Sequence, residues 1–205
     1  VEAAIQLKKV KEPELIAISV VHGDNTITNE DIVRNFDGKL ADDIFQVTGI
    51  KQRNHVSEKQ NLLTLATEAA TAALEKAALS IEDIDGIICS TGTPDIVTPS
   101  LACRVLNNLS NGKDIMTQAH DINAACSGYI YGLQHAYDVL AQKENANILL
   151  ITAEVLSPLL DETDFSTAII FGDAATATIV SNKHAADKGL RLNRPELSAD
   201  RKSVV

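Results

Sequence analysis

The feature that most constrains this chain is the alternation of short, largely apolar runs with longer segments that repeat apolar residues at helical spacing. The runs at residues 15–21, 86–90 and 146–153 are rich in isoleucine, leucine and valine. Such runs are typical of strands that are buried on both faces. The segment 61–79 instead spaces leucine and alanine along one helical face. Strands that alternate with helices predict an α/β fold whose sheet is covered by helices on both faces.

The pattern predicts the following elements. Helices are expected at residues 28–36, 61–79, 99–109 and 126–142, and strands at residues 15–21, 86–90, 115–123, 146–153, 165–171 and 175–180. The first helix is indicated by capping residues and acids from Thr28 onward. Aromatic residues make up only 3% of the chain, so aliphatic side chains must build the core.

Composition and charge narrow the functional classes. The chain has 205 residues, is 45% hydrophobic and carries a formal net charge of −10. Nucleic acids and anionic membranes attract positive surfaces, so neither is an expected partner. An acidic protein partner stays open, because it needs only a local basic patch. No apolar run approaches the ~20 residues of a membrane span.

Cys89, Cys103 and Cys126 are far apart and lack the spacing of a zinc site. No metal and no cofactor are therefore expected. Reduced thiols point to the cytoplasm. We expect Cys89, within a strand, and Cys103, within a helix, to fill the core.

Cys126 stands where a predicted strand passes into a helix. The first turn of a helix has unpaired N–H groups and a partial positive charge, which stabilise a thiolate and can hold an oxyanion. Its neighbours are small, so a substrate could approach closely. The position predicts an activated nucleophile, sheltered where water is scarce. A structural cysteine in the core is the alternative that the residues alone leave open.

The segment Asp-Ile-Asn-Ala-Ala-Cys-Ser-Gly at residues 121–128 resembles the active-site segment of β-ketoacyl-acyl-carrier-protein synthase III. Three other stretches resemble the same family in the same order. They are Thr-Gly-Ile-Lys-Gln-Arg at 48–53, Thr-Pro-Asp-Ile-Val-Thr-Pro-Ser at 93–100 and Phe-Gly-Asp-Ala-Ala-Thr-Ala at 171–177. The resemblance implies a thiolase-like αβα layered half with a mixed, mostly parallel sheet, and a homodimer of subunits that each contain two such halves.

The resemblance also implies a reaction. Cys126 would accept an acyl group from a thioester, and the acyl group would condense with malonyl-acyl-carrier protein as the malonyl group loses CO₂, in fatty-acid or polyketide synthesis. Two alternatives stay open. One is a thiolase-fold acyltransferase that forms an ester, an amide or a non-decarboxylative product, and the other is a non-catalytic half-subunit.

The resemblance divides the chain into a lead-in segment at 1–12, an N-terminal thiolase-like domain at 13–181, and at 182–205 the start of a connection to a C-terminal half. The catalytic His and Asn of the family are expected in that second half. We therefore expect a homodimer or a companion chain, and no complete condensation by residues 1–205 alone. The five histidines are expected to be structural or solvated, with His120 packing locally.

Several residues depart from the family pattern. Family members that take a CoA primer hold it with a Trp and two Arg, where this chain has Asp43, Val47 and Phe165. The loss of two cations predicts that an acyl-carrier protein delivers the acyl group. The alternative is that other residues bind CoA in a different way.

Two further departures concern the pocket and a turn. Thr98 matches a family residue that crosses the dimer interface and borders the acyl pocket. Because Thr98 is small, we expect this substrate-binding position to admit a medium or long acyl chain. Ala174 and Thr176 replace family glycines, so the turn before them is either strained or differently shaped.

Overall fold

The computed structural model describes residues 12–161, 163–183 and 189–198. Its main feature is a six-stranded sheet in the order β5-β4-β6-β7-β1-β8. The strands are β1 Glu14–His22, β4 Gly86–Ser90, β5 Gln118–Ile122, β6 Asn147–Glu154, β7 Ala174–Ser181 and β8 Leu190–Arg191.

The sheet is mixed. Strand β4 runs parallel to both of its neighbours, β5 and β6. Strand β7 runs antiparallel to both β6 and β1, so β1 points in the same direction as β6. Strand β8 runs antiparallel to β1. Four of the six described strands therefore share one direction, which confirms the predicted mixed, mostly parallel sheet.

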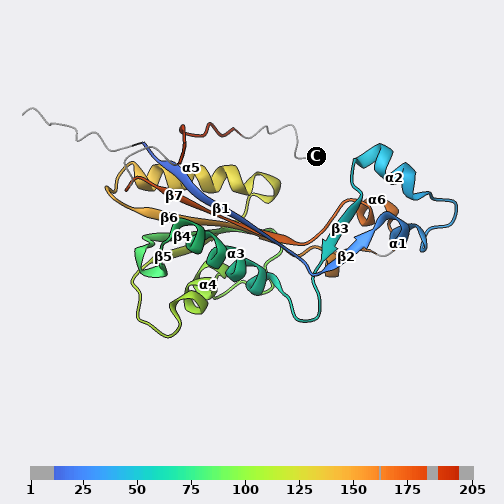
Figure 1. Ribbon diagram of the computed structural model, residues 1–205, viewed down its shortest axis with the longest axis horizontal. Helices are drawn as coiled ribbons and strands as arrows, with labels where there is room; N and C mark the ends of the chain where they lie inside the picture. Colours follow the sequence, from blue (N-terminus) through green and yellow to red (C-terminus); the bar gives the residue numbers. More distant parts are fainter. Residues whose placement is uncertain (1–11, 162, 184–188, 199–205) are drawn as a thin grey trace, which may run out of the picture.

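Helices cover both faces of the sheet, as predicted (Figure 1). Helices α3 (Leu62–Ala77) and α4 (Leu101–Ser110) lie on one face, and α5 (Gly128–Leu140) lies on the other. The face of α3 toward the sheet is built from alanines that have no exposed surface: Ala66, Ala69, Ala70 and Ala73. These short side chains let the helix approach so closely that the Ser19 hydroxyl of β1 donates a hydrogen bond to the Ala69 carbonyl.

Helix α5 uses glycine for the same purpose on the opposite face. A Cβ at Gly132 would lie 2.3 Å from the Cδ1 of Leu150 on β6. Leu150 belongs to a buried cluster with Leu133, Ala136 and Leu140 of α5. The helix that follows Cys126 is thus held tightly to the middle of the sheet.

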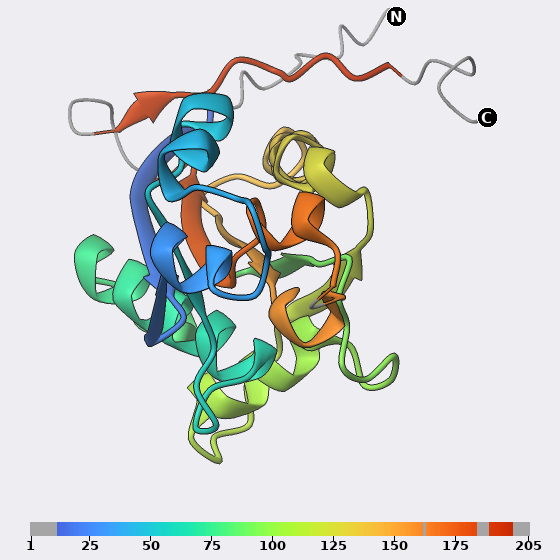
Figure 2. The same ribbon diagram turned by 90° about the vertical axis from the view of Figure 1, so that its right-hand side faces the viewer.

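A small satellite unit extends from one end of the sheet, and it faces the viewer in Figure 2. It contains β2 (Asn25–Thr28), α1 (Asn29–Val33), α2 (Ala41–Thr48), β3 (Gln52–His55) and α6 (Phe165–Ala168). Its buried core is Ile32, Ile44 and Ile169. Short 3₁₀ turns lie elsewhere, at Ile81–Asp83 and Ser157–Leu159.

Arg53 ties this satellite unit together. One guanidinium nitrogen donates to Asn29 Oδ1 (2.9 Å) and to the Ile169 carbonyl (2.8 Å), and the other terminal nitrogen donates to the Ile27 carbonyl (3.3 Å). Burial lowers the pKa of Arg53. The acceptors are neutral oxygens on three different segments, so the side chain joins α1 and β2 to the segment after α6.

The sequence prediction was wrong for residues 165–171, which were expected to form a strand. Residues Phe165–Ala168 form the helix α6 instead, because the Asp164 side chain caps it by accepting a hydrogen bond from the Ser166 N–H (3.0 Å). The apolar run that suggested a strand places Ile169 in the satellite core. The elements β2, β3 and α2 were not predicted.

The segment 182–205, predicted to start a connection to a C-terminal half, contributes contacts to this domain within its described residues. Strand β8 pairs with the start of β1, where Leu190 faces Leu15. Asn182 donates hydrogen bonds to the carbonyls of Leu140 (2.8 Å) and Lys143 (2.7 Å) at the end of α5. Of the lead-in segment 1–12, all but the last residue lies outside the described residues. Within the described ranges, no helix is both long and apolar enough to cross a membrane.

Candidate active site

Cys126 lies in a single 3₁₀ turn, η2 (Ala125–Ser127), between the end of β5 and the start of α5. The residue before it, Ala125, has a φ of 45°, a left-handed conformation that is uncommon for a residue with a side chain. The strand-to-helix junction expected from the sequence is therefore present. The thiol itself is exposed. The predicted shelter from water is wrong for the described chain, because the turn follows an edge strand and no described element covers it.

The start of α5 is fixed by contact with the end of β4. A Cβ at Gly128 would lie 1.9 Å from the Oγ of Ser90, so this position has no room for a side chain. Further along α5, the Tyr129 hydroxyl lies 3.2 Å from the Thr178 hydroxyl of β7. These contacts set the height of the Cys126 turn above the sheet.

Cys126 lines a pocket of about 440 Å³. The pocket lies where β4 and β6, which run parallel, reach their carboxyl ends side by side. Strand β4 contributes Ser90, and β6 contributes Thr152 and Glu154. The other lining residues are Gly92, Thr93, Ala125, Tyr129, Leu156 and Phe171. A thiol at the rim of a pocket with leucine and aromatic walls can present its sulfur to an electrophile whose apolar tail lies inside.

Asp173, in the turn that resembles a family motif, organises one side of this pocket. Its carboxylate is buried and accepts hydrogen bonds from the N–H groups of Leu156 (2.8 Å), Ser157 (2.9 Å) and Val56 (2.8 Å). The Ser157 hydroxyl donates a fourth. Asp173 thereby fixes the backbone on both sides of the wall that Leu156 and Phe171 form. Sequence reasoning matched this motif but did not assign the role to Asp173.

Thr98, the predicted substrate-binding residue, is exposed on the loop 91–100 and does not line the Cys126 pocket. The loop is anchored on α4, where Arg104 forms a two-bonded ion pair with Asp95 (2.6 and 2.9 Å). Asp121 of β5 accepts hydrogen bonds from the N–H groups of Leu101 (2.7 Å) and Ala102 (2.8 Å). The predicted role of Thr98 depends on a dimer interface, so it stays a prediction.

The other two cysteines differ from each other. Cys89 has no exposed surface, as predicted. Burial, and next the charge of Asp121, raise the pKa of Cys89 well above its ordinary value. The prediction that Cys103 fills the core is wrong, because Cys103 is exposed. It lies on α4 beside the edge strand β5, where its thiol donates to the Ala119 carbonyl (3.7 Å).

None of the four histidines that the structure describes lines the Cys126 pocket. His120 packs locally, as expected, with its ring edge-on to His135 at 4.8 Å between centroids. Burial, and next the repulsion from His135, lower the pKa of His120. The pair joins β5 to α5 on the face of the sheet that carries the nucleophile helix.

The residues that replace the expected CoA contacts lie in the satellite unit. Asp43 and Val47 are exposed on α2. Phe165 packs edge-on to Phe36 at 5.1 Å, and the Lys39 ammonium lies 4.8 Å above its ring centroid. Phe165 therefore serves the packing of the satellite unit.

The turn that lacks the family glycines is not strained. Ala174 and Thr176 belong to β7, and neither is among the described residues with positive φ. The described backbone thus carries no left-handed strain at these two residues.

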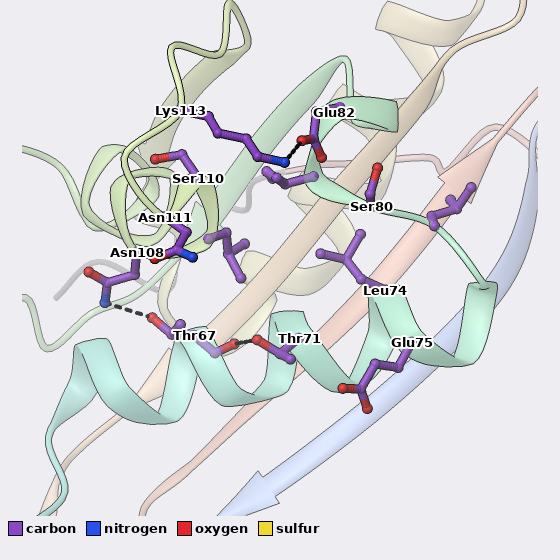
Figure 3. Close-up of a pocket in the computed structure, with 13 residues that line it drawn as sticks. Thr67, Thr71, Leu74, Glu75, Ser80, Glu82, Asn108, Ser110, Asn111 and Lys113 are labelled. Atoms are coloured by element: carbon purple, nitrogen blue, oxygen red, sulfur yellow. Dashed lines mark hydrogen bonds and ion pairs between the residues drawn. The ribbon is translucent and has the colours of Figure 1, made fainter.

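A second pocket lies on the other side of the sheet, between α3 and the end of α4 (Figure 3). Its polar groups bond to one another. Asn108 donates to the Thr67 hydroxyl (3.3 Å), and Lys113 pairs with Glu82. Its lining contains neither cysteine nor histidine. The pocket that Cys126 lines is therefore the better candidate for chemistry.

Comparison with known proteins gives a consistent result. The sequence pattern of the family described as 3-oxoacyl-[acyl-carrier-protein (ACP)] synthase III matches residues 120–200. The chain is 41% identical over 169 residues to β-ketoacyl-[acyl-carrier-protein] synthase III of Campylobacter curvus, which covers 82% of this chain and 49% of that protein. It is 36% identical over 182 residues to the protein of the same name from Lactobacillus helveticus, covering 88% and 54%.

Solved structures agree with the sequence relatives. The crystal structure of 3-oxoacyl-[acyl-carrier-protein] synthase III from Aquifex aeolicus superposes with a TM-score of 0.76 at 38% identity, over 86% of this chain and 55% of that one. The chain thus spans about half the length of the relatives that it matches.

Proposed function

We propose, from the premise that this chain belongs to the 3-oxoacyl-[acyl-carrier-protein] synthase III family, that Cys126 accepts an acyl group from a thioester. The predicted thiolase-like α/β fold is confirmed by the same relatives. One observation carries the proposal. Cys126 lies in the turn that starts a helix, and its thiol lines a pocket with apolar walls.

The chemistry follows from that position. The Cys126 thiolate attacks the carbonyl carbon of the thioester, a new C–S bond forms, and the donor's C–S bond breaks. The donor leaves as a thiolate that takes up the proton lost by Cys126. The partial positive charge at the start of the helix favours the oxyanion of the intermediate. The acyl chain is held against Leu156 and Phe171.

The second step is proposed from family membership. Malonyl-acyl-carrier protein loses CO₂, and the resulting carbanion attacks the carbonyl carbon of acyl-Cys126. A carbon–carbon bond forms, and the Cys126 thiolate is released. The product is a β-ketoacyl-carrier protein, an intermediate of fatty-acid or polyketide synthesis.

The donor and the partners are part of the proposal. Asp43 and Val47 offer no cation to a nucleotide phosphate, which favours an acyl-carrier protein as donor. We expect the protein to act in the cytoplasm, since its three cysteines are free thiols. We also expect a homodimer or a companion chain, and Thr98 at the acyl pocket that this assembly completes.

Intact-mass spectrometry tests the acylation step. The protein is mixed with octanoyl-carrier protein or octanoyl-CoA, and the modified peptide is mapped. The wild-type chain should gain one acyl group at Cys126, and faster from the carrier protein. Cys126→Ala should gain none. Cys103→Ala is the matched control, because it removes the other exposed thiol and should acylate normally. Equal labelling of Cys103 and Cys126 would show non-specific chemistry and would contradict the proposal.

A further inference from the structure

The carboxylate of Glu154 forms a closed set of hydrogen bonds in the wall of the Cys126 pocket. Glu154 is the last residue of β6. Its Oε1 accepts from the N–H of Gly92 (2.7 Å), and its Oε2 accepts from the hydroxyl of Thr93 (2.7 Å). The same hydroxyl oxygen accepts from the N–H of Val155 (3.0 Å). Each carboxylate oxygen thus has its own donor, and Thr93 is held from two sides.

These bonds join two segments that are far apart in the sequence. Gly92 and Thr93 begin the loop 91–100 and line the pocket together with Glu154 and Cys126. Hydrogen bonds to a charged acceptor are about twice as strong as neutral ones. The loop is held again further along by the Asp95–Arg104 ion pair. The Glu154 bonds act at the point where the loop forms the pocket wall.

A charged carboxylate is an unusual choice for the wall of a pocket that takes an acyl chain. Glu154 is half-buried there, so its carboxylate gives up part of its hydration. The two donors offset this cost, since both oxygens already accept hydrogen bonds within the protein. A glutamine would keep only one acceptor oxygen for the two donors, and an apolar side chain would keep none. The hydrogen bonds to Gly92 and Thr93 therefore account for a carboxylate at this position.

We infer that Glu154 is a positioning residue for the acyl pocket: it holds Gly92 and Thr93 in place, and so sets the size of the group that can reach Cys126. The inference rests on the proposed function of Cys126. Glu154 makes no bond to the reacting atoms. Its effect on the reaction passes through the loop.

Kinetics of Cys126 modification separate this role from a general effect on folding. Glu154→Ala should slow acylation by octanoyl-carrier protein roughly ten-fold, since misplacement of a pocket wall by 1 Å can cost more than that. Its reaction with iodoacetamide, a small reagent, should stay within about two-fold of wild type, because no group touching the sulfur is lost. Glu154→Gln keeps one acceptor oxygen, so its rate of acylation by octanoyl-carrier protein should lie between the rates of wild type and Glu154→Ala.

A double-variant cycle tests whether Glu154 acts through Thr93. Thr93→Val keeps the shape of the side chain and removes the hydroxyl. If the two residues act as one unit, Glu154→Ala/Thr93→Val should be no slower than the slower single variant. Glu75→Ala is the matched control, since Glu75 is an exposed glutamate at the pocket of Figure 3, on the other face of the sheet. It should leave every rate unchanged.

Hydrogen exchange of the backbone gives a readout that does not need acyl transfer. The Gly92 N–H should exchange faster in Glu154→Ala than in wild type, while protection of α3 stays the same. If wild-type Cys126 takes no acyl group from any donor, the proposed function fails, but hydrogen exchange and alkylation by maleimides of increasing size still test the loop. Unchanged Gly92 exchange, an unchanged preference for reagent size, or additive rate losses in the double variant would overturn the inference.

Discussion

Gly128 and Ser90 approach each other so closely that a Cβ on the glycine would lie 1.9 Å from the serine Oγ. Gly128 is the first residue of α5, and Ser90 is the last residue of β4. The contact seats the nucleophile helix on β4, which lies next to the edge strand β5. Both residues lie at the Cys126 pocket, Ser90 in its lining and Gly128 two positions after the thiol.

Gly128→Ala should therefore lower the free energy of unfolding by about 1–3 kcal/mol, as overpacking does in a tight core. It should also slow the acylation of Cys126, because α5 must move away from β4. Urea unfolding and the mass-spectrometric assay measure the two effects. Adding Ser90→Ala removes the clashing hydroxyl and should restore part of the stability. No recovery in the double variant would mean that this contact does not limit the helix position.

Ala125 has a left-handed backbone next to the nucleophile, and a β-branched side chain fits that conformation poorly. Ala125→Val should cost roughly 1–2 kcal/mol of stability and slow the alkylation of Cys126. The neighbouring Ala124, with a φ of −138°, offers a matched control. Because φ is negative at Ala124, Ala124→Val avoids the left-handed conformation and should cost less. Thermal unfolding of both variants makes the comparison, and equal losses would contradict the argument from backbone conformation.

Asp173→Asn should destabilise the protein by at least about 2 kcal/mol, because it turns one acceptor oxygen toward its donors as an NH₂ group. Either orientation of the amide leaves at least one backbone N–H unpaired. Chemical denaturation measures the loss. Asp164→Asn is the control, since that half-buried aspartate caps only the short helix α6. A loss at Asp173 no larger than the loss at Asp164 would show that the buried bonds contribute little.

His120 should make stability depend on pH. Its pKa lies below the ordinary value of 6.5, first because of burial and then because of His135, while Asp121 acts in the opposite direction. As the pH falls through 6.5, the unfolded chain takes up a proton before the folded one does, so the free energy of unfolding decreases. The decrease ends once the folded His120 is also protonated.

His120→Gln should therefore flatten the dependence of unfolding free energy on pH between about pH 5 and 7, the range in which histidine titrates. Urea unfolding at several pH values measures the slope. His22→Gln, at the exposed end of β1, is the control and should keep the wild-type slope. An unchanged slope in His120→Gln would exclude this histidine as its source.

Elements with a strong local pattern were predicted from the sequence. Helix α3 and strand β6 were correct because alanine spacing and a continuous apolar run each favour one structure. The helix α6 was missed because its apolar residues also suit a strand, and the cap at Asp164 was the weaker signal. Strands β2 and β3 are short and polar, so only their pairing with each other defines them.

The same distinction between local pattern and tertiary contact applies to the candidate site. The sequence by itself determined the α/β class and Cys126 at a strand-to-helix junction, because both depend on residues that are neighbours in the chain. Only the tertiary structure decided that Cys126 and Cys103 are exposed, that Thr98 lies outside the Cys126 pocket, and that Glu154 holds Gly92 and Thr93. Exposure and such contacts depend on segments some sixty residues apart, which meet only when the strands align in the sheet.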